Sequence, residues 1–242
     1  MVTKMRQILS VISLCTILLV SFGCSDGGHN FQSTADLYDA AVADAVFADS
    51  AEIYPQLTAI TTDNTELEWR DGRVLVVTFT RHPDSYPEGE TIQAWWGETW
   101  VTVVPELSDF YAGVRQRADE PLLRIEQVLG LPEGTGNTWF AEMWVHPSDL
   151  YRPCPDNEIT DSVCELSFPD SATSEHQDWF NAQITKSYFQ EHKFPWTRLG
   201  YTYDWGNPHS AIGLSEFIVK QDAEVVIEKV ARYDDYLLET PL

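Results

Sequence analysis

The chain has 242 residues, of which 43% are hydrophobic and 12% are aromatic. This is enough apolar material for one domain with a large core, so the composition excludes a globally disordered chain. The formal net charge is −23, and beyond residue 23 there remain 13 basic and 38 acidic residues, a net charge of −25. Such a charge repels phosphate backbones and anionic lipid surfaces. We therefore expect no nucleic-acid partner and no basic membrane-binding patch.

A short basic segment and an apolar run stand near the N-terminus. Lys4 and Arg6 precede residues 8–22, which are almost wholly apolar. As a helix this run would rise only about 22 Å, less than the ~30 Å hydrocarbon core of a bilayer. The pattern is typical of a signal peptide rather than of a membrane span. Residues 1–23 are therefore predicted to be a cleaved export signal.

The apolar run ends in Ser21-Phe22-Gly23-Cys24. This ending resembles a bacterial lipoprotein signal peptide, in which a small residue precedes an invariant Cys that accepts lipid. Gly23 and Cys24 match that family, whereas Ser21 and Phe22 depart from the Leu and the small residue that are usual there. The resemblance implies a lipid on Cys24. In a Gram-negative host, Ser25 after that Cys implies sorting to the outer membrane.

The residues after Cys24 are polar and small, which suits a flexible tether. Residues 24–32 are expected to link the lipid to a single domain over residues 33–242. The expected location is then the bacterial cell envelope, with the lipid bilayer as a partner through that lipid. A second interpretation stays open, because Ser-Phe-Gly also satisfies the small-x-small rule of ordinary signal peptidase. Its product would be a soluble periplasmic protein.

Helix and strand patterns mix in the first half of the predicted domain. Ser33 and Asp36 start a helix, and Asp71-Gly72 indicates a hairpin turn. The run 74–77 is apolar at every position, as in a central strand. In chain order the predicted segments are a helix from 33 to about 46, strands at 66–70, 73–80, 92–96 and 99–104, a helix from Pro105 and a helix over 119–129.

The second half adds further segments of both kinds. They are a strand at 138–145, a proline-rich loop over 146–174, a helix over 174–191 with Ser174 and Gln177 as a capping box, and a closing hairpin of strands 211–219 and 223–230. No repeat or βαβ alternation is present. The predicted fold class is therefore α+β: one domain with a mostly antiparallel sheet, several packed helices and one loop disulfide.

That disulfide is predicted from the distribution of the four cysteines. Cys15 lies in the predicted export signal and Cys24 would carry lipid. Cys154 and Cys164 remain as an even pair in an exported protein, which favours a disulfide. The pair would pin the proline-rich loop.

Motifs with a known catalytic mechanism are absent from the sequence. There is no Walker loop, no GxGxxG after a strand and no HExxH, and the segment from Gly213 to Phe217 lacks the second Gly of a nucleophile elbow. The acidic run 156–161 lacks the loop Gly and the acidic twelfth position of an EF-hand. No metal and no cofactor are predicted.

One candidate site follows the strand at 138–145. His146, Asp149 and Arg152 lie on a loop next to the predicted disulfide. A His–Asp pair can act in acid–base chemistry, and an Arg can hold an anion through two hydrogen bonds. The structural alternative is that Asp149 caps a turn and Arg152 pairs with a nearby acid.

A second candidate is an aromatic segment. Tyr201, Tyr203 and Trp205 alternate and would lie on one strand face, a binding surface for sugars or peptides, with Arg198 as a further binding residue. The alternative is a core strand. Asp204 and His209 form a second possible acid–base pair.

A third candidate is the cluster Trp95, Trp96 and Trp100, which forms a hydrophobic bed in the core or facing a partner. From these features the preferred hypothesis is a non-catalytic envelope lipoprotein that binds a protein or glycan partner through an aromatic-rich face. The alternative is an envelope hydrolase that uses His146 with Asp149, or Asp204 with His209.

Overall fold

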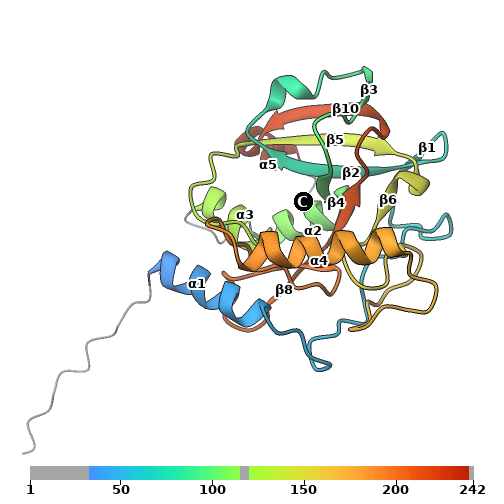
Figure 1. Ribbon diagram of the computed structural model, residues 1–242. Helices are drawn as coiled ribbons and strands as arrows, with labels where there is room; N and C mark the ends of the chain where they lie inside the picture. Colours follow the sequence, from blue (N-terminus) through green and yellow to red (C-terminus); the bar gives the residue numbers. More distant parts are fainter. Residues whose placement is uncertain (1–32, 115–119, 240–242) are drawn as a thin grey trace, which may run out of the picture. The chain divides into compact units, whose positions relative to one another are not determined.

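The computed structural model describes residues 33–114 and 120–239 (Figure 1). The predicted export signal, Cys24 and the tether over 24–32 lie outside the described residues. In chain order the elements are α1 (Thr34–Ala45), β1 (Trp69–Arg70), β2 (Arg73–Thr80), the 3-10 helix η1 (Pro83–Ser85), β3 (Thr91–Gln93), β4 (Thr99–Val103), α2 (Val104–Val114), α3 (Pro121–Val128), β5 (Trp139–Val145), the 3-10 helix η2 (Pro147–Asp149), β6 (Leu150–Tyr151), α4 (Ser174–Tyr188), β7 (Tyr201–Tyr203), β8 (Ile212–Ser215), β9 (Phe217–Val219), β10 (Glu224–Arg232) and α5 (Tyr233–Glu239).

The main sheet has eight strands, in the order β3-β10-β5-β2-β4-β9-β6, with β1 paired to β2. Every neighbouring pair in it is antiparallel. A separate two-stranded ribbon joins β7 to β8. In Figure 1, α1 and α4 lie on the opposite side of this domain from β5 and β10. The predicted α+β class with a mostly antiparallel sheet is confirmed.

The central strand is buried on both faces, as its continuous apolar run predicts. The exposed fractions of Val74, Leu75, Val76 and Val77 do not exceed 3%. Val74 and Val76 belong to a core with side chains of β4, β5, β9 and β10. Leu75 and Val77 pack in a second core with α2, α3 and α5. The sheet therefore separates two apolar layers.

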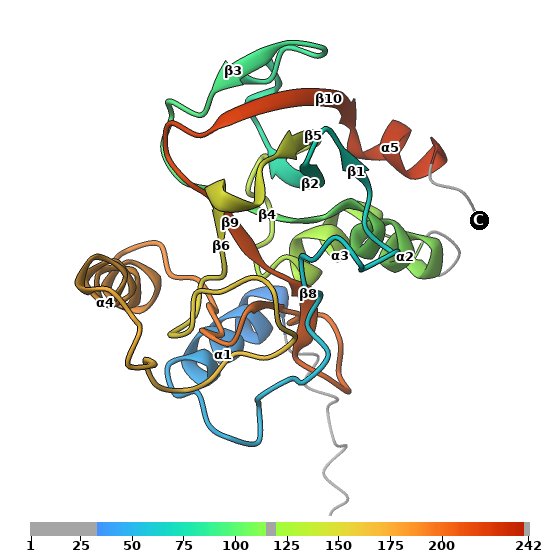
Figure 2. The ribbon, with the colours of Figure 1, turned by 90° about the vertical axis from the view of Figure 1, so that its right-hand side faces the viewer.

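The predicted closing hairpin is wrong, because β9 and β10 do not pair. Residues 220–222 do turn, with the amide of Ala223 donating to the carbonyl of Lys220 (3.2 Å), but β9 joins β4 and β6 whereas β10 joins β3 and β5. In a flat sheet these strands would stand four spacings apart, about 19 Å. The five Cα-to-Cα steps from Val219 to Glu224 span at most about 18 Å when extended. The turn is shorter than that, so the sheet must curl to bring β9 and β10 together (Figure 2).

The N-cap of α1 is the predicted residue, whereas the N-cap of α4 lies one residue before the predicted one. Ser33 and Asp36 form the capping box of α1. The N-cap of α4 is Thr173, whose hydroxyl accepts from the amide of His176. The prediction that Ser174 and Gln177 form this cap is therefore wrong by one residue. Both Ser and Thr are good N-caps, so composition alone does not choose between adjacent positions.

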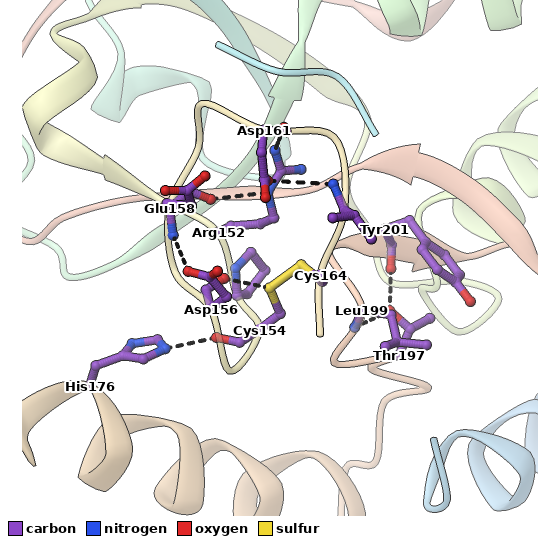
Figure 3. Close-up of a disulfide and its surroundings, with 12 residues drawn as sticks. Arg152, Cys154, Asp156, Glu158, Asp161, Cys164, His176, Thr197, Leu199 and Tyr201 are labelled. Atoms are coloured by element: carbon purple, nitrogen blue, oxygen red, sulfur yellow. Dashed lines mark hydrogen bonds between the residues drawn. A yellow bond between two sulfur atoms is a disulfide. The ribbon is translucent and has the colours of Figure 1, made fainter. Parts of the chain in front are cut away.

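The predicted disulfide between Cys154 and Cys164 is present, with an S–S distance of 2.05 Å. Both cysteines are buried, and Arg152 beside them has no exposed surface. The Arg152 guanidinium donates to the carbonyls of Thr58 (3.2 Å), Glu158 (3.2 Å) and Asp161 (2.8 Å). The disulfide and the guanidinium thus hold the same loop from two sides (Figure 3).

Replacing both Cys154 and Cys164 by Ala is expected to lower the free energy of unfolding by roughly 3 kcal/mol. The crosslinked residues are 10 apart in sequence, and closing a loop of that size removes entropy from the unfolded chain. Urea unfolding of the variant and the wild type measures the difference. Wild type in reductant should fall to the stability of the variant, and equal stability of oxidised wild type and variant would contradict the prediction.

Candidate ligand-binding cavity

The first predicted acid–base cluster is dispersed. His146 is exposed at the end of β5, where its Nδ1 lies 2.8 Å from the Ser148 hydroxyl. Asp149 ends η2, and its carbonyl accepts from the amide of Lys220. The structure records no hydrogen bond or ion pair among the side chains of His146, Asp149 and Arg152, all of which it describes. Because Arg152 is fully buried, its guanidinium offers no surface to an external anion.

The second predicted acid–base pair, Asp204 and His209, lines one open pocket, but no hydrogen bond or ion pair between the two side chains is recorded among the described residues. Asp204 is buried and forms a two-pronged ion pair with Arg124. His209 is exposed, and its amide donates to the side chain of Asn207. Arg198, predicted to bind a partner, donates to the carbonyls of Ala45 (3.2 Å) and Val46 (2.7 Å) at the end of α1. It therefore stabilises the C-terminus of that helix.

The predicted aromatic face is divided between two places. β7 ends at Tyr203, so Trp205 is not on the same strand as Tyr201 and Tyr203. Tyr201 and Trp205 are buried. The Tyr201 hydroxyl donates to the carbonyl of Glu52 (2.9 Å), and the Trp205 indole donates to that of Leu131 (2.9 Å). The three rings therefore do not form one exposed surface.

The three clustered indoles have different environments. Trp95 is 70% exposed. Trp96 and Trp100 are partly buried, and both line a cavity that opens where the sheet divides.

This cavity exists because β2 and β4 separate. They pair at Val76–Val103 and Val77–Thr102, after which the remaining residues of β4 pair with β9 instead. The first chamber lies beyond this divergence, with a volume of about 290 Å³. Thr102 lines it, and its buried hydroxyl has no hydrogen-bond partner in the described part of the chain.

A second chamber of about 290 Å³ adjoins the first. It is lined by the C-terminal part of α4, the segment 194–196 and β7, including Tyr201 and Tyr203. The two chambers share five lining residues: Trp100, Leu129, Leu131, Thr202 and Glu216. Four of these carry apolar or hydrogen-bonded side chains, because the Thr202 hydroxyl already donates to the carbonyl of Val128 and accepts from the amide of Leu214.

Glu216 is the exception among the shared residues. It is the single residue between β8 and β9, where the chain leaves the ribbon and enters the main sheet. Its amide donates to the carbonyl of Gly200 (2.9 Å). Within the described residues its carboxyl has no hydrogen bond or ion pair, and burial raises its pKa to about 8. Glu216 is partly buried and lines both chambers.

Glu216 was not among the residues predicted from the sequence. The available signal was a lone carboxylate in the apolar run 211–219. Comparisons with protein-family models, with curated proteins and with solved structures gave no match. Of the helices in the described ranges, none combines the length and the apolar character that crossing a bilayer requires.

Proposed function

We propose that this protein is an exported, lipid-anchored binding protein that takes a small amphipathic molecule into the two chambers around Glu216. The observation that carries the proposal is the cavity itself. Two adjoining chambers are lined mainly by aromatic and aliphatic side chains, with one unpartnered carboxyl at their shared wall. Small-molecule sites typically combine an apolar lining with a few polar groups that orient the ligand.

Within the described residues neither His–acid pair is joined by a hydrogen bond, which favours binding over the alternative of a hydrolase. Acid–base catalysis needs a base within hydrogen-bond reach of its partner. His146 and His209 are both exposed, and neither lines either chamber. An aromatic-lined cavity, to which Tyr201 and Tyr203 contribute, takes the place of the exposed aromatic face expected from the sequence.

The cavity is tested with Nile red, a neutral apolar dye whose emission reports an apolar environment. We expect saturable binding to wild type and at least tenfold weaker binding to Thr102→Phe, whose ring would fill the first chamber. Trp95→Ala, which alters an exposed ring outside both chambers, should bind as wild type does. Circular dichroism verifies folding. Absent saturable binding, or equal loss in Trp95→Ala, would reject the cavity as the site.

The proposed anchor rests on the match of Gly23-Cys24 to the lipoprotein signal pattern. Cys24→Ala in the full chain should abolish incorporation of radiolabelled palmitate and release the protein from membranes. A wild-type protein that takes up no label would favour a soluble periplasmic product. Ligand binding in the chambers does not depend on the anchor.

A further inference from the structure

We infer that the cavity takes an organic cation, a protonated amine on an apolar body, whose ammonium group pairs with the carboxylate of Glu216. This inference rests on the proposed function and specifies the chemical class of its ligand. Three features of the chambers carry it: the absence of a cation from their described lining, their aromatic side chains and the unpartnered carboxyl of Glu216.

The charge of the lining has one sign. Among the described residues that line the two chambers there is no Lys, Arg or His, and the acids are Glu98 and Glu216. An anionic ligand would find no cation in this lining to pair with, and an unpaired charge is strongly unfavourable in an apolar site. The net charge of the whole chain, −23, also draws cations rather than anions toward its surface.

Only one of the two acids is available to a ligand. Glu98 accepts hydrogen bonds from the Tyr151 hydroxyl (2.9 Å) and the Trp179 indole (2.9 Å). Glu216 has neither a hydrogen bond nor an ion pair in the described residues. A carboxyl placed in an apolar cavity without a partner destabilises its own ionised form. An ammonium group beside it would supply the missing charge, which predicts a single cationic head group per ligand.

The lining around Glu216 also suits a cation. Trp100 and Trp196 both line the second chamber with it, and their rings stand edge to face with centroids 6.3 Å apart. Aromatic faces attract ammonium groups, and this attraction strengthens where water is excluded. The remaining lining is largely aliphatic or aromatic and would bury an apolar body. A neutral ligand would gain neither the attraction to these aromatic faces nor an ion pair with the ionised form of Glu216.

Binding of an amine should change the protonation of Glu216. With a pKa of about 8, the carboxyl is mostly protonated at pH 7 in the free protein. Pairing with an ammonium group favours the ionised form, so close to one proton should leave for the buffer on binding. Burial raises the pKa of Tyr86 and of Tyr201, which line the chambers, to about 12. Burial likewise raises the pKa of Tyr188 and of Tyr203, so these tyrosines do not titrate near pH 7.

The test uses three probes with one apolar body: 4-phenylbutylamine, 4-phenylbutanol and 4-phenylbutyrate. Isothermal titration calorimetry at pH 7 is run in two buffers of different ionisation heat, which measures proton release. For wild type we expect the amine to bind at least tenfold more tightly than the alcohol, the carboxylate not to bind, and one proton to be released with the amine. Glu216→Gln should lose the amine preference and the proton release while retaining the alcohol.

A matched control removes the same charge elsewhere. Glu90→Gln alters an exposed acid outside both chambers and should keep the amine preference of wild type. If the amine binds no more tightly than the alcohol, including no binding of either, the inference is overturned. It is overturned as well if Glu216→Gln keeps the preference or Glu90→Gln loses it. Nile red binding that persists in any of these cases shows that the cavity function stands without the cation.

Discussion

Glu216→Gln is expected to be more stable than wild type at pH 9 and within about 1 kcal/mol of it at pH 5. The carboxyl has an ordinary pKa of 4.5, which burial raises to about 8 in the folded protein. Between these values the folded state binds more protons than the unfolded state. The wild-type free energy of unfolding therefore falls as the pH rises through this window. Gln resembles the neutral acid in shape and does not titrate, so the variant lacks this loss.

The expected difference is a few kcal/mol. Each unit of pKa shift corresponds to about 1.36 kcal/mol, which gives an upper value of roughly 4–5 kcal/mol above pH 8. Water in the chambers would reduce it. Urea unfolding at pH 5, 7 and 9 measures the effect. Glu90→Gln, the exposed control, should follow wild type at each pH. Parallel curves for Glu216→Gln and wild type would show that this carboxyl ionises freely in the folded state.

The sequence was sufficient to predict those structural features that depend on residues close together in the chain. The capping box at Ser33, the continuous apolar run 74–77 and the cysteine pair each predicted the feature that the structure has. In each case the determining residues lie within about ten positions of one another. The N-cap of α4 was missed by one residue, because Thr173 and Ser174 can both cap a helix and Ser is the more favoured of the two.

The pairing of β9 and β10 could not be predicted, because it depends on the curl of the whole sheet. The turn over 220–222 forms as its residues suggest. However, both edges of β9 are already paired, with β4 and β6. Both edges of β10 are paired with β3 and β5. A short connection between adjacent segments normally indicates a hairpin. Here the short connection joins two strands that do not pair. The end of β9 comes close to the start of β10 only because the sheet between them bends.

The sequence also predicted the wrong residues for the binding site, because the partners of charged side chains depend on the tertiary structure. In an acidic chain, Arg152 stood out as a possible anion-binding residue and Arg198 as a binding residue of the aromatic face, but both bind backbone carbonyls of the same chain. Asp204 likewise pairs with Arg124. Sequence gives the type of a charged residue but not its burial or its partner. Glu216 became a candidate only once the divergence of β2 from β4 placed a cavity beside it.

Gly200 connects the disulfide loop to this cavity. Its carbonyl accepts from the amide of Glu216, and it directly precedes β7. A Cβ added to Gly200 would lie 2.6 Å from Cys164 Sγ, 2.8 Å from Arg152 Cδ and 3.0 Å from Leu57 Cδ1. The first two neighbours cannot easily move, because the sulfur is crosslinked and the guanidinium is held by three carbonyls. The backbone at Gly200 must therefore shift in any variant with a side chain there.

Gly200→Ala is consequently expected to lower the free energy of unfolding by about 3 kcal/mol or more. Its φ of +76° costs an Ala about 1–2 kcal/mol, and overpacking of this kind adds about 1–3 kcal/mol. Gly72→Ala is the matched control, since Gly72 has the same φ of +76° with nothing within 4 Å of the added Cβ. Urea unfolding of both variants isolates the steric part as the difference between them.

The same pair of variants tests whether the loop supports the cavity. A shift of Gly200 would displace the Glu216 amide and β7, whose Tyr201 and Tyr203 line the second chamber. Nile red binding should therefore weaken in Gly200→Ala under conditions where it remains folded, and stay unchanged in Gly72→Ala. Equal destabilisation of the two variants would mean that the packing around the disulfide yields to an added methyl group. Unchanged dye binding in Gly200→Ala would mean that the chambers keep their shape independently of the disulfide loop.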